Sequence, residues 1–315
     1  MPSSSPYPAL ATTSSADNGA SESLDLPRIL CLHGGGTNAR IFAAQCRVLR
    51  AALSSTFRFV FAEAPFPSRP GPDVVSVYGT WGPFKSWLRL QDGDAPGLDS
   101  VDIVEAVDTS LADAMISDDA LGATGEWVGL LGFSQGAKMA ASLLLRQQAR
   151  ATFSRHSRIS TFRFAVLFAG RAPLVALDNS LQLVGEYLAD AVQISSSAWR
   201  PPAKDLGRAT SKDSHATVSP SGRYWDRDVV GKLAVIEDDD HLLRLPTIHV
   251  HGLSDPGLLL HQDLLGHFCT EESATVVEWG GAHRMPIKTA DVRKVVTEIC
   301  RVAAESGAIG EYDFL

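Results

Sequence analysis

Short apolar runs alternate along the chain with longer segments whose apolar residues follow helical spacing. Brief runs rich in Val, Leu, Ile and Phe are typical of parallel strands that are buried on both faces. The predicted strands are 28–32, 57–62, 127–131, 162–168, 247–251 and 275–279, and the predicted helices are 41–53, 101–115, 136–148, 257–268 and 289–304. This alternation predicts an α/β fold with a doubly wound, mostly parallel sheet, and functional loops at the carboxyl ends of its strands.

The segment from 171 to 245 is far longer than a connection between parallel strands requires. Because it follows a strand end, we expect a lid-like insertion over the active face, and a surface excursion without a role is the alternative. The first residues are rich in Ser, Ala and Thr. The predicted organisation is a disordered tail over 1–25, an α/β domain over 26–306 with the insertion at about 171–245, and a C-terminal tail over 307–315.

Aromatic residues gather in a second unusual segment, 66–90, among Pro and Gly. They are Tyr78, Trp81, Phe84 and Trp87, which are too many for an exposed loop. Either they close the core under a long loop or they line an apolar groove that binds substrate, and the sequence favours neither alternative.

Composition narrows the class of protein. A formal charge of −8 and the lack of a long basic run argue against nucleic acid or an anionic membrane surface as a partner. No run approaches the roughly 18 apolar residues of a membrane span, and the first 25 residues contain no Lys or Arg, so the charged start of a secretory signal is missing. We expect a soluble, cytoplasmic protein. Its four cysteines lack C-x-x-C spacing and are expected to be buried free thiols: Cys31, Cys46, Cys269 and Cys300.

Candidate chemistry begins at residues 132–136, where the sequence is G-F-S-Q-G. The pattern G-x-S-x-G lies between a predicted strand and a predicted helix with small residues. This context is typical of a sharp turn that exposes a nucleophilic serine, here Ser134. A serine in an ordinary turn between strand and helix is the alternative.

A serine nucleophile requires a base, and the base requires a carboxylate that orients it. His283 follows the last predicted strand in the short turn G-G-A-H, and Asp255 follows the strand 247–251. The alternative for Asp255 is that it begins a turn or caps the next helix. His249 and His251 alternate within that strand, so we expect one to face each side of the sheet. Both are expected to be structural, since no third metal ligand has suitable spacing.

Backbone amides are expected to bind the oxyanion of the reaction. The first donor is the amide of Gln135, which follows the nucleophile at the start of a helix. The second is the amide of Gly35 in the loop H-G-G-G after the first strand, with Gly36 as the next choice. A phosphate cradle is the alternative for this loop, but the G-x-G-x-x-G spacing and the lysine of a P-loop are absent. The reaction needs no metal and no cofactor.

Five motifs together resemble the FSH serine hydrolase family of α/β-hydrolases over roughly residues 27–304. They are I-L-C-L-H-G at 29–34, A-E-A-P at 62–65, G-F-S-Q-G-A at 132–137, L-F-A-G at 167–170 and G-A-H at 281–283. The resemblance implies Ser134 as nucleophile, Asp255 as acid and His283 as base. It also implies a thioesterase that releases a polyketide chain from the acyl carrier domain of its synthase. The family often has a bulky residue after His-Gly, where this chain has Gly35.

Two other functions remain open. A general carboxylesterase would use the same catalytic groups on small oxygen esters. A protein of hydrolase fold that binds a ligand without catalysis would have lost its chemistry, although all three catalytic side chains are present.

Overall fold

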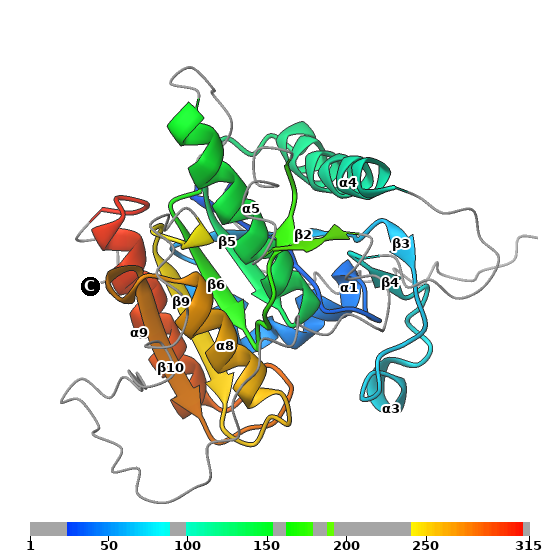
Figure 1. Cartoon of the computed structure of the whole chain (residues 1–315). Coiled ribbons are helices and arrows are strands. Elements are labelled where there is room, and N and C mark those ends of the chain that lie inside the picture. Colours follow the sequence, from blue (N-terminus) through cyan, green and yellow to red (C-terminus); the bar gives the residue numbers. More distant parts are fainter. Residues whose placement is uncertain (1–23, 89–98, 154–161, 179–187, 192–240, 311–315) are drawn as a thin grey trace, which may run out of the picture.

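The computed structural model describes residues 24–88, 99–153, 162–178, 188–191 and 241–310. Its centre is a six-stranded sheet in the order β10-β9-β6-β5-β1-β2 (Figure 1), and every strand pair in it is parallel. The strands are β1 (Arg28–Leu32), β2 (Arg58–Ala62), β5 (Trp127–Phe133), β6 (Phe164–Phe168), β9 (Thr247–Gly252) and β10 (Ala274–Trp279). The predicted α/β fold with a parallel sheet is confirmed.

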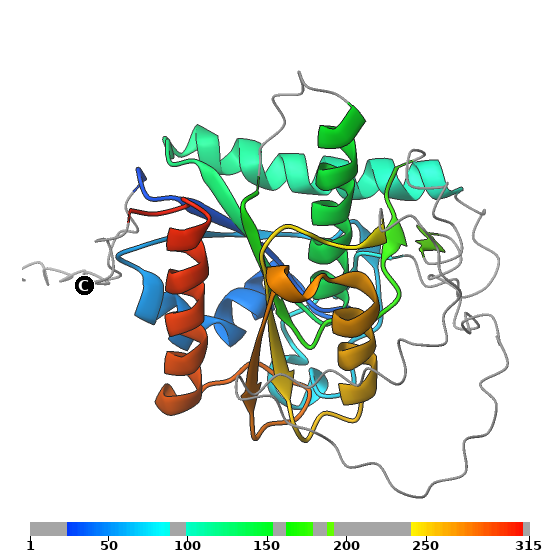
Figure 2. The ribbon, with the colours of Figure 1, turned by 60° about the vertical axis from the view of Figure 1, so that its left-hand side comes forward.

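Helices cover both faces of the sheet (Figure 2). On one face lie α1 (Ala39–Gln45), α2 (Arg47–Leu53) and α9 (Thr289–Glu305), and on the other lie α4 (Ser100–Ala120), α5 (Gln135–Phe153) and α8 (Leu258–Phe268). The single helix predicted over 41–53 is wrong, because the chain turns at Cys46 (φ −81°, ψ 0°). The apolar pattern did not reveal this break, because the apolar residues of α1 and α2 are buried in the same hydrophobic cluster.

The burial of each strand depends on whether the strand lies inside the sheet or at its edge. The strands β1, β6 and β9 are buried along their whole length, whereas the edge strands β2 and β10 include half-buried positions. A strand with helices on both faces and a neighbour on each side has no position for a solvated side chain. The continuous apolar runs therefore mark the inner strands. All four cysteines are buried and none forms a disulfide, as predicted.

The prediction that His249 and His251 face opposite sides of the sheet is wrong. Their ring centroids lie 6.0 Å apart, so the two side chains share one face of the sheet. Side chains of a strand repeat with a period of two, so residues two apart point the same way. Both histidines are buried, and the Nε2 atom of His249 lies 3.1 Å from the Thr247 hydroxyl.

Short elements complete the described chain. They are β3 (Phe66–Pro67), α3 (Val75–Tyr78), β4 (Lys85–Ser86), β7 (Val175–Ala176), β8 (Ala189–Asp190) and the 3₁₀ helix η3 (Glu271–Ser273). Ala308 and Ile309 are buried in the cluster that contains α9. Most of the predicted N-terminal tail and most of the predicted lid-like insertion lie outside the described residues. In the described ranges no helix combines the length and the apolar character that crossing a membrane requires.

Candidate active site

Ser134 occupies a sharp turn between β5 and α5. Its backbone is left-handed (φ 53°), and its amide donates to the Phe168 carbonyl at 2.8 Å. A Cβ atom at Gly132 would overlap the Gly136 carbonyl, and one at Gly136 would overlap the Leu32 carbonyl. The two glycines therefore allow β5, the turn and β1 to approach closely enough to hold Ser134 in this conformation.

The structure brings the three predicted side chains together at the carboxyl edge of the sheet. Asp255 follows β9 and His283 follows β10. The Nδ1 atom of His283 lies 2.6 Å from Asp255 Oδ2, and its Nε2 atom lies 3.0 Å from Ser134 Oγ. The Asp255 side chain is fully buried, and 27% of the His283 side chain is exposed. These contacts are those that a nucleophile, a base and an orienting carboxylate require.

Hydrogen bonds stabilise the charged form of Asp255. Burial alone would raise the pKa of this carboxyl group, but the Gly257 amide and the hydrogen bond and charge of His283 outweigh burial and lower the pKa. An ionised carboxylate only accepts hydrogen bonds, so the proton between the two groups belongs to His283 Nδ1. The Nε2 atom of His283 is then free to accept the proton of Ser134.

The predicted amide donors lie in the loop after β1 and at the first residue of α5. The amide of Gly36 donates to the Lys85 carbonyl at 2.9 Å, so it is already used. The amides of Gly35 and Gln135 have no acceptor among the described residues. The Gln135 side chain packs against Gly35, and its Oε1 atom accepts from the Ser86 hydroxyl and from the Trp87 amide at 2.9 and 2.8 Å. These bonds hold the segment after β4 against the nucleophile turn.

His33 anchors the glycine loop, a role that the sequence did not reveal. Its Nδ1 atom donates to the Gly34 carbonyl at 2.8 Å, and its Nε2 atom accepts from the Ala64 amide at 3.1 Å. Burial lowers the pKa of His33 to about 4, so the ring is neutral at neutral pH. The motif H-G after β1 was the available signal, but the sequence does not show which groups the ring would contact.

The structure decides between the two alternatives for one residue of the aromatic segment, Trp87. Trp87 is fully buried and its indole donates to the His33 carbonyl at 2.8 Å, so Trp87 belongs to the core and does not line a groove. Tyr78, Trp81 and Phe84 are half-buried, and the rings of Tyr78 and Trp81 lie 5.2 Å apart. Substrate contact stays a prediction for these three residues.

Two further side chains surround Asp255, and sequence reasoning missed both. His261 on α8 is fully buried, its Nε2 atom lies 3.6 Å from Asp255 Oδ2, and neither ring nitrogen has a hydrogen-bond partner among the described residues. Arg171 follows β6, and its Nη2 atom lies 3.6 Å from Asp255 Oδ1. Neither residue belongs to a motif with a known spacing.

Asp255, His261 and His283 also place possible metal ligand atoms within 4.8 Å of one another. The Arg171 guanidinium beside Asp255 already supplies a positive charge at this position. A second cation would be repelled there, and it would compete with the hydrogen bond between His283 and Asp255. The arrangement therefore fits a hydrogen-bonded triad better than a metal centre.

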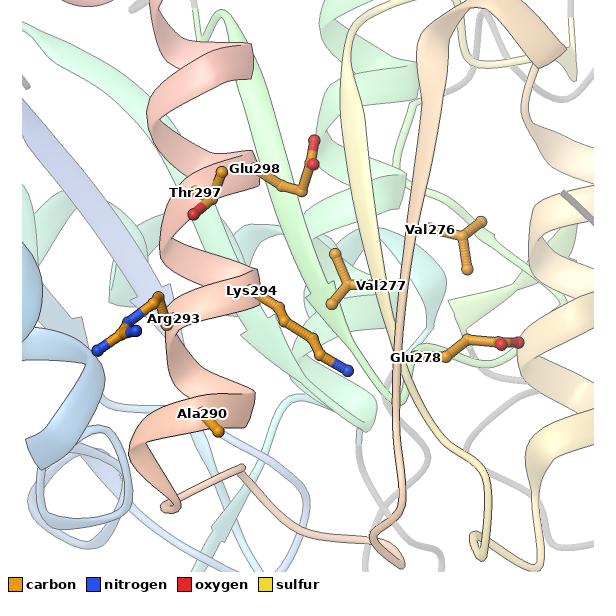
Figure 3. Close-up of a pocket in the computed structure, with 8 residues that line it drawn as sticks. All are labelled: Val276, Val277, Glu278, Ala290, Arg293, Lys294, Thr297 and Glu298. Atoms are coloured by element: carbon orange, nitrogen blue, oxygen red, sulfur yellow. The ribbon is translucent and has the colours of Figure 1, made fainter. Parts of the chain in front are cut away.

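A groove lies elsewhere on the molecule, between the edge strand β10 and helix α9 (Figure 3). It contains none of the three triad residues. Its lining residues are Val276, Val277, Glu278, Ala290, Arg293, Lys294, Thr297 and Glu298.

The parallel sheet, the nucleophile turn after β5 and the order Ser, Asp, His define an α/β-hydrolase fold of the serine hydrolase class. Within that class the chain belongs to the family described as serine hydrolase (FSH1), whose model matches residues 23–295.

Several relatives are fungal esterases of high identity. The chain is 52% identical to Esterase pigG of Monascus ruber over 289 residues, which cover 91% of this chain and 94% of that protein. It is 46% identical to Esterase dbaE of Emericella nidulans over 295 residues, which cover 93% and 96%. It is 47% identical to Esterase citA of Monascus ruber over 288 residues, which cover 91% and 96%.

Solved structures match at low identity. Acyl-protein thioesterase 2 of Zea mays is 15% identical with a TM-score of 0.44, and the match covers 88% of this chain and 94% of that one. A carboxylesterase from Mesorhizobium loti is 15% identical with a TM-score of 0.42, and the match covers 88% and 89%.

Proposed function

We propose that the protein hydrolyses an acyl ester or thioester with Ser134 as nucleophile, His283 as base and Asp255 as the orienting acid. The contact of His283 Nε2 with Ser134 Oγ at 3.0 Å, with Nδ1 bound to Asp255, carries this proposal. The names of the fungal relatives, all called esterases, support it.

The reaction proceeds through an acyl-enzyme. His283 Nε2 accepts the Ser134 proton as Oγ attacks the carbonyl carbon, and Asp255 stabilises the imidazolium that forms. The amides of Gln135 and Gly35 donate to the oxyanion. His283 then protonates the leaving alcohol or thiol, and water hydrolyses the acyl-enzyme by the same steps to release a carboxylic acid.

The substrate within this proposal is a polyketide chain held as a thioester on the acyl carrier domain of its synthase. The resemblance of the five sequence motifs to the FSH family supports this substrate. A general carboxylesterase acting on small oxygen esters is the second candidate, and the names of the relatives, which are called esterases, favour it. The catalytic groups serve sulfur and oxygen leaving groups alike.

Covalent labelling tests the nucleophile. A fluorophosphonate probe should modify Ser134 in the folded protein, and Ser134→Ala should abolish both labelling and hydrolysis. The matched control is Ser254→Ala, since Ser254 is an exposed serine beside Asp255 at the same edge of the sheet. Folded wild-type protein that resists the probe would contradict the catalytic proposal and favour a protein that only binds a ligand.

Matched substrates test the leaving group. Each acyl chain is offered as an acyl-pantetheine thioester and as the corresponding oxygen ester, and kcat/KM is compared. A releasing thioesterase should prefer the thioesters. Equal or faster turnover of short oxygen esters would favour the carboxylesterase candidate.

A further inference from the structure

Arg171 is a cation beside the reacting groups that the proposed mechanism does not use. It follows β6, which lies next to β5, the strand that ends just before Ser134. Its Nη2 atom lies 3.3 Å from His283 Nδ1 and 3.6 Å from Asp255 Oδ1. The side chain is 36% exposed, so it reaches solvent beside His283. Arg171 can therefore contact a molecule bound at Ser134.

The triad does not satisfy the hydrogen-bond donors of Arg171. In the working tautomer His283 Nδ1 donates its proton to Asp255, so this atom cannot accept from Arg171. Asp255 Oδ1 accepts from the Gly257 amide at 2.8 Å and is too far from the guanidinium for a hydrogen bond. The Nε atom of Arg171 is buried and has no partner among the described residues. Within the described ranges, Arg171 is thus ion-paired with Asp255, but in this tautomer its Nε and Nη2 donors have no acceptor at hydrogen-bond distance.

The surrounding chain makes room for this guanidinium and adds a second cation. A Cβ atom at Gly257 would lie only 2.6 Å from Arg171 Nη2, so the absence of a side chain there allows the guanidinium to occupy its position.

A second cation, Lys138, lies one helical turn after Ser134 and is half-buried. Its ammonium donates to the Ala172 carbonyl at 3.4 Å, and no carboxylate pairs with it among the described residues.

Two neighbouring cations repel each other, and an anion between them would relieve this repulsion. Burial, and then the charge of Arg171, lower the pKa of Lys138 to about 8.

The strand order β6-β5-β1 places Arg171 on one side of Ser134 and Gly35 on the other. Arg171 is therefore separate from the predicted oxyanion donors and is suited to a different oxygen of the substrate.

We propose that Arg171 and Lys138 form a subsite for an acceptor oxygen, such as a carboxylate, enolate or ketone, on the acyl chain close to the scissile carbonyl. The subsite rests on the proposed function, since it selects among acyl groups that Ser134 attacks. A contact of 3.3 Å with His283, which itself contacts Ser134, restricts the bound oxygen to the first carbons of the chain.

A role of Arg171 as the counter-ion of Asp255 predicts a different result. In that role the guanidinium would stabilise the triad alone, and its removal would slow the hydrolysis of every acyl group by the same factor. A subsite instead changes the ratio between substrates that have the oxygen and substrates that lack it.

Three thioesters of N-acetylcysteamine separate these roles. Malonyl carries a carboxylate, 3-oxobutanoyl carries a ketone at the same carbon, and butanoyl carries neither. Wild-type protein should have a kcat/KM for malonyl and 3-oxobutanoyl about tenfold or more above that for butanoyl. Arg171→Gln should reduce this ratio about tenfold, and Lys138→Gln should reduce it less. The control Arg284→Gln should retain the ratio, because Arg284 is exposed and its guanidinium lies over Trp279.

An equal loss for all three thioesters in Arg171→Gln would overturn the proposal, and so would a wild-type preference for butanoyl. The location of the oxygen is tested with 3-carboxyphenyl butanoate and phenyl butanoate. If a carboxylate raised kcat/KM only on the phenyl leaving group and not on the acyl chain, the assignment of the subsite to the acyl chain would be overturned.

A binding measurement keeps the subsite testable without turnover. Calorimetry on Ser134→Ala should show malonate binding more tightly than butanoate, and the added substitution Arg171→Gln should remove the difference. Equal binding of the two acids would overturn the subsite. Failure of the fluorophosphonate to label Ser134 would instead contradict the proposed function, so the two failures are distinguishable.

Discussion

At the scale of single residues, the nucleophile turn depends on backbone that ordinary side chains would block. Ser134 has a left-handed conformation, which costs a residue with a Cβ atom roughly 1–2 kcal/mol. The packing of α5 against β1 compensates this cost, because Gly136 lets the start of the helix approach the carbonyl groups of Leu32 and His33. The position of Ser134 is therefore set by its neighbours.

Gly136→Ala should disrupt this turn. The new methyl group would overlap backbone oxygen atoms that cannot move without shifting β1, so we expect hydrolysis to be lost and stability to fall by several kcal/mol. The control is Gly266→Ala in α8, where a Cβ atom would meet nothing within 4 Å. That substitution should stabilise the protein by about 0.5–1 kcal/mol. Urea unfolding and initial rates measure both effects, and an active, stable Gly136→Ala protein would contradict the interpretation.

At the scale of elements, buried charges join the end of α4 to the start of the sheet. Asp118 on α4 pairs with Arg28 at 3.3 Å and with Arg58 at 2.6 Å, and these arginines begin β1 and β2. The three side chains are between 5% and 12% exposed. Neither arginine could regain full hydration if the carboxylate were removed.

Asp118→Ala should lower the free energy of unfolding by about 3–5 kcal/mol, because it removes the buried carboxylate that Arg58 and Arg28 share and leaves Arg28 only its ion pair with the exposed Asp119. Asp113→Ala is the matched control, since Asp113 lies on the same helix and is exposed. It should change stability by less than about 0.5 kcal/mol. Urea titrations of both variants provide the measurement. If Asp118→Ala unfolded at the same urea concentration as Asp113→Ala, the ion pairs of Asp118 would not stabilise the sheet.

At the scale of the whole molecule, buried neutral histidines link stability to pH. Burial is the main cause that lowers the pKa of His33, His251 and His261 to about 4 and of His249 to about 3. The unfolded chain binds protons at these groups near pH 6.5, whereas the folded chain does not. Acidification therefore favours the unfolded state throughout the interval between about 6.5 and 4.

Stability should fall as the pH is lowered from 7 to 5, by about 2 kcal/mol for each of these histidines that stays neutral in the fold. Because the pKa values are lowered on folding, the stabilising contribution is complete above pH 6.5 and is lost on acidification. His249→Gln should reduce the pH slope of the unfolding free energy near pH 5.5 by about 1.4 kcal/mol per pH unit. Urea titrations at several pH values measure this slope, and an unchanged slope in the variant would exclude His249 as a source.

Sequence reasoning succeeded where the signal is local. Apolar runs reveal buried strands, and the groups that follow a strand can be placed at one edge of the sheet, as for Asp255 and His283. Long-range contacts have no such signal. Trp87 belongs to the core because it contacts His33, which lies 54 residues earlier in the chain. Arg171 and His261 meet Asp255 only when β6, β9 and α8 have packed, and no spacing in the sequence encodes their approach.

The residues of the candidate site leave the carboxyl ends of five different strands. Gly35 follows β1, Ser134 follows β5, Arg171 follows β6, Asp255 follows β9 and His283 follows β10. A fragment that lacks any of these five strands therefore cannot assemble the whole site, since the site exists only when the five strands are in register. Enzyme activity is thus a reporter of global folding, and its loss in denaturant should coincide with the loss of the sheet measured by circular dichroism.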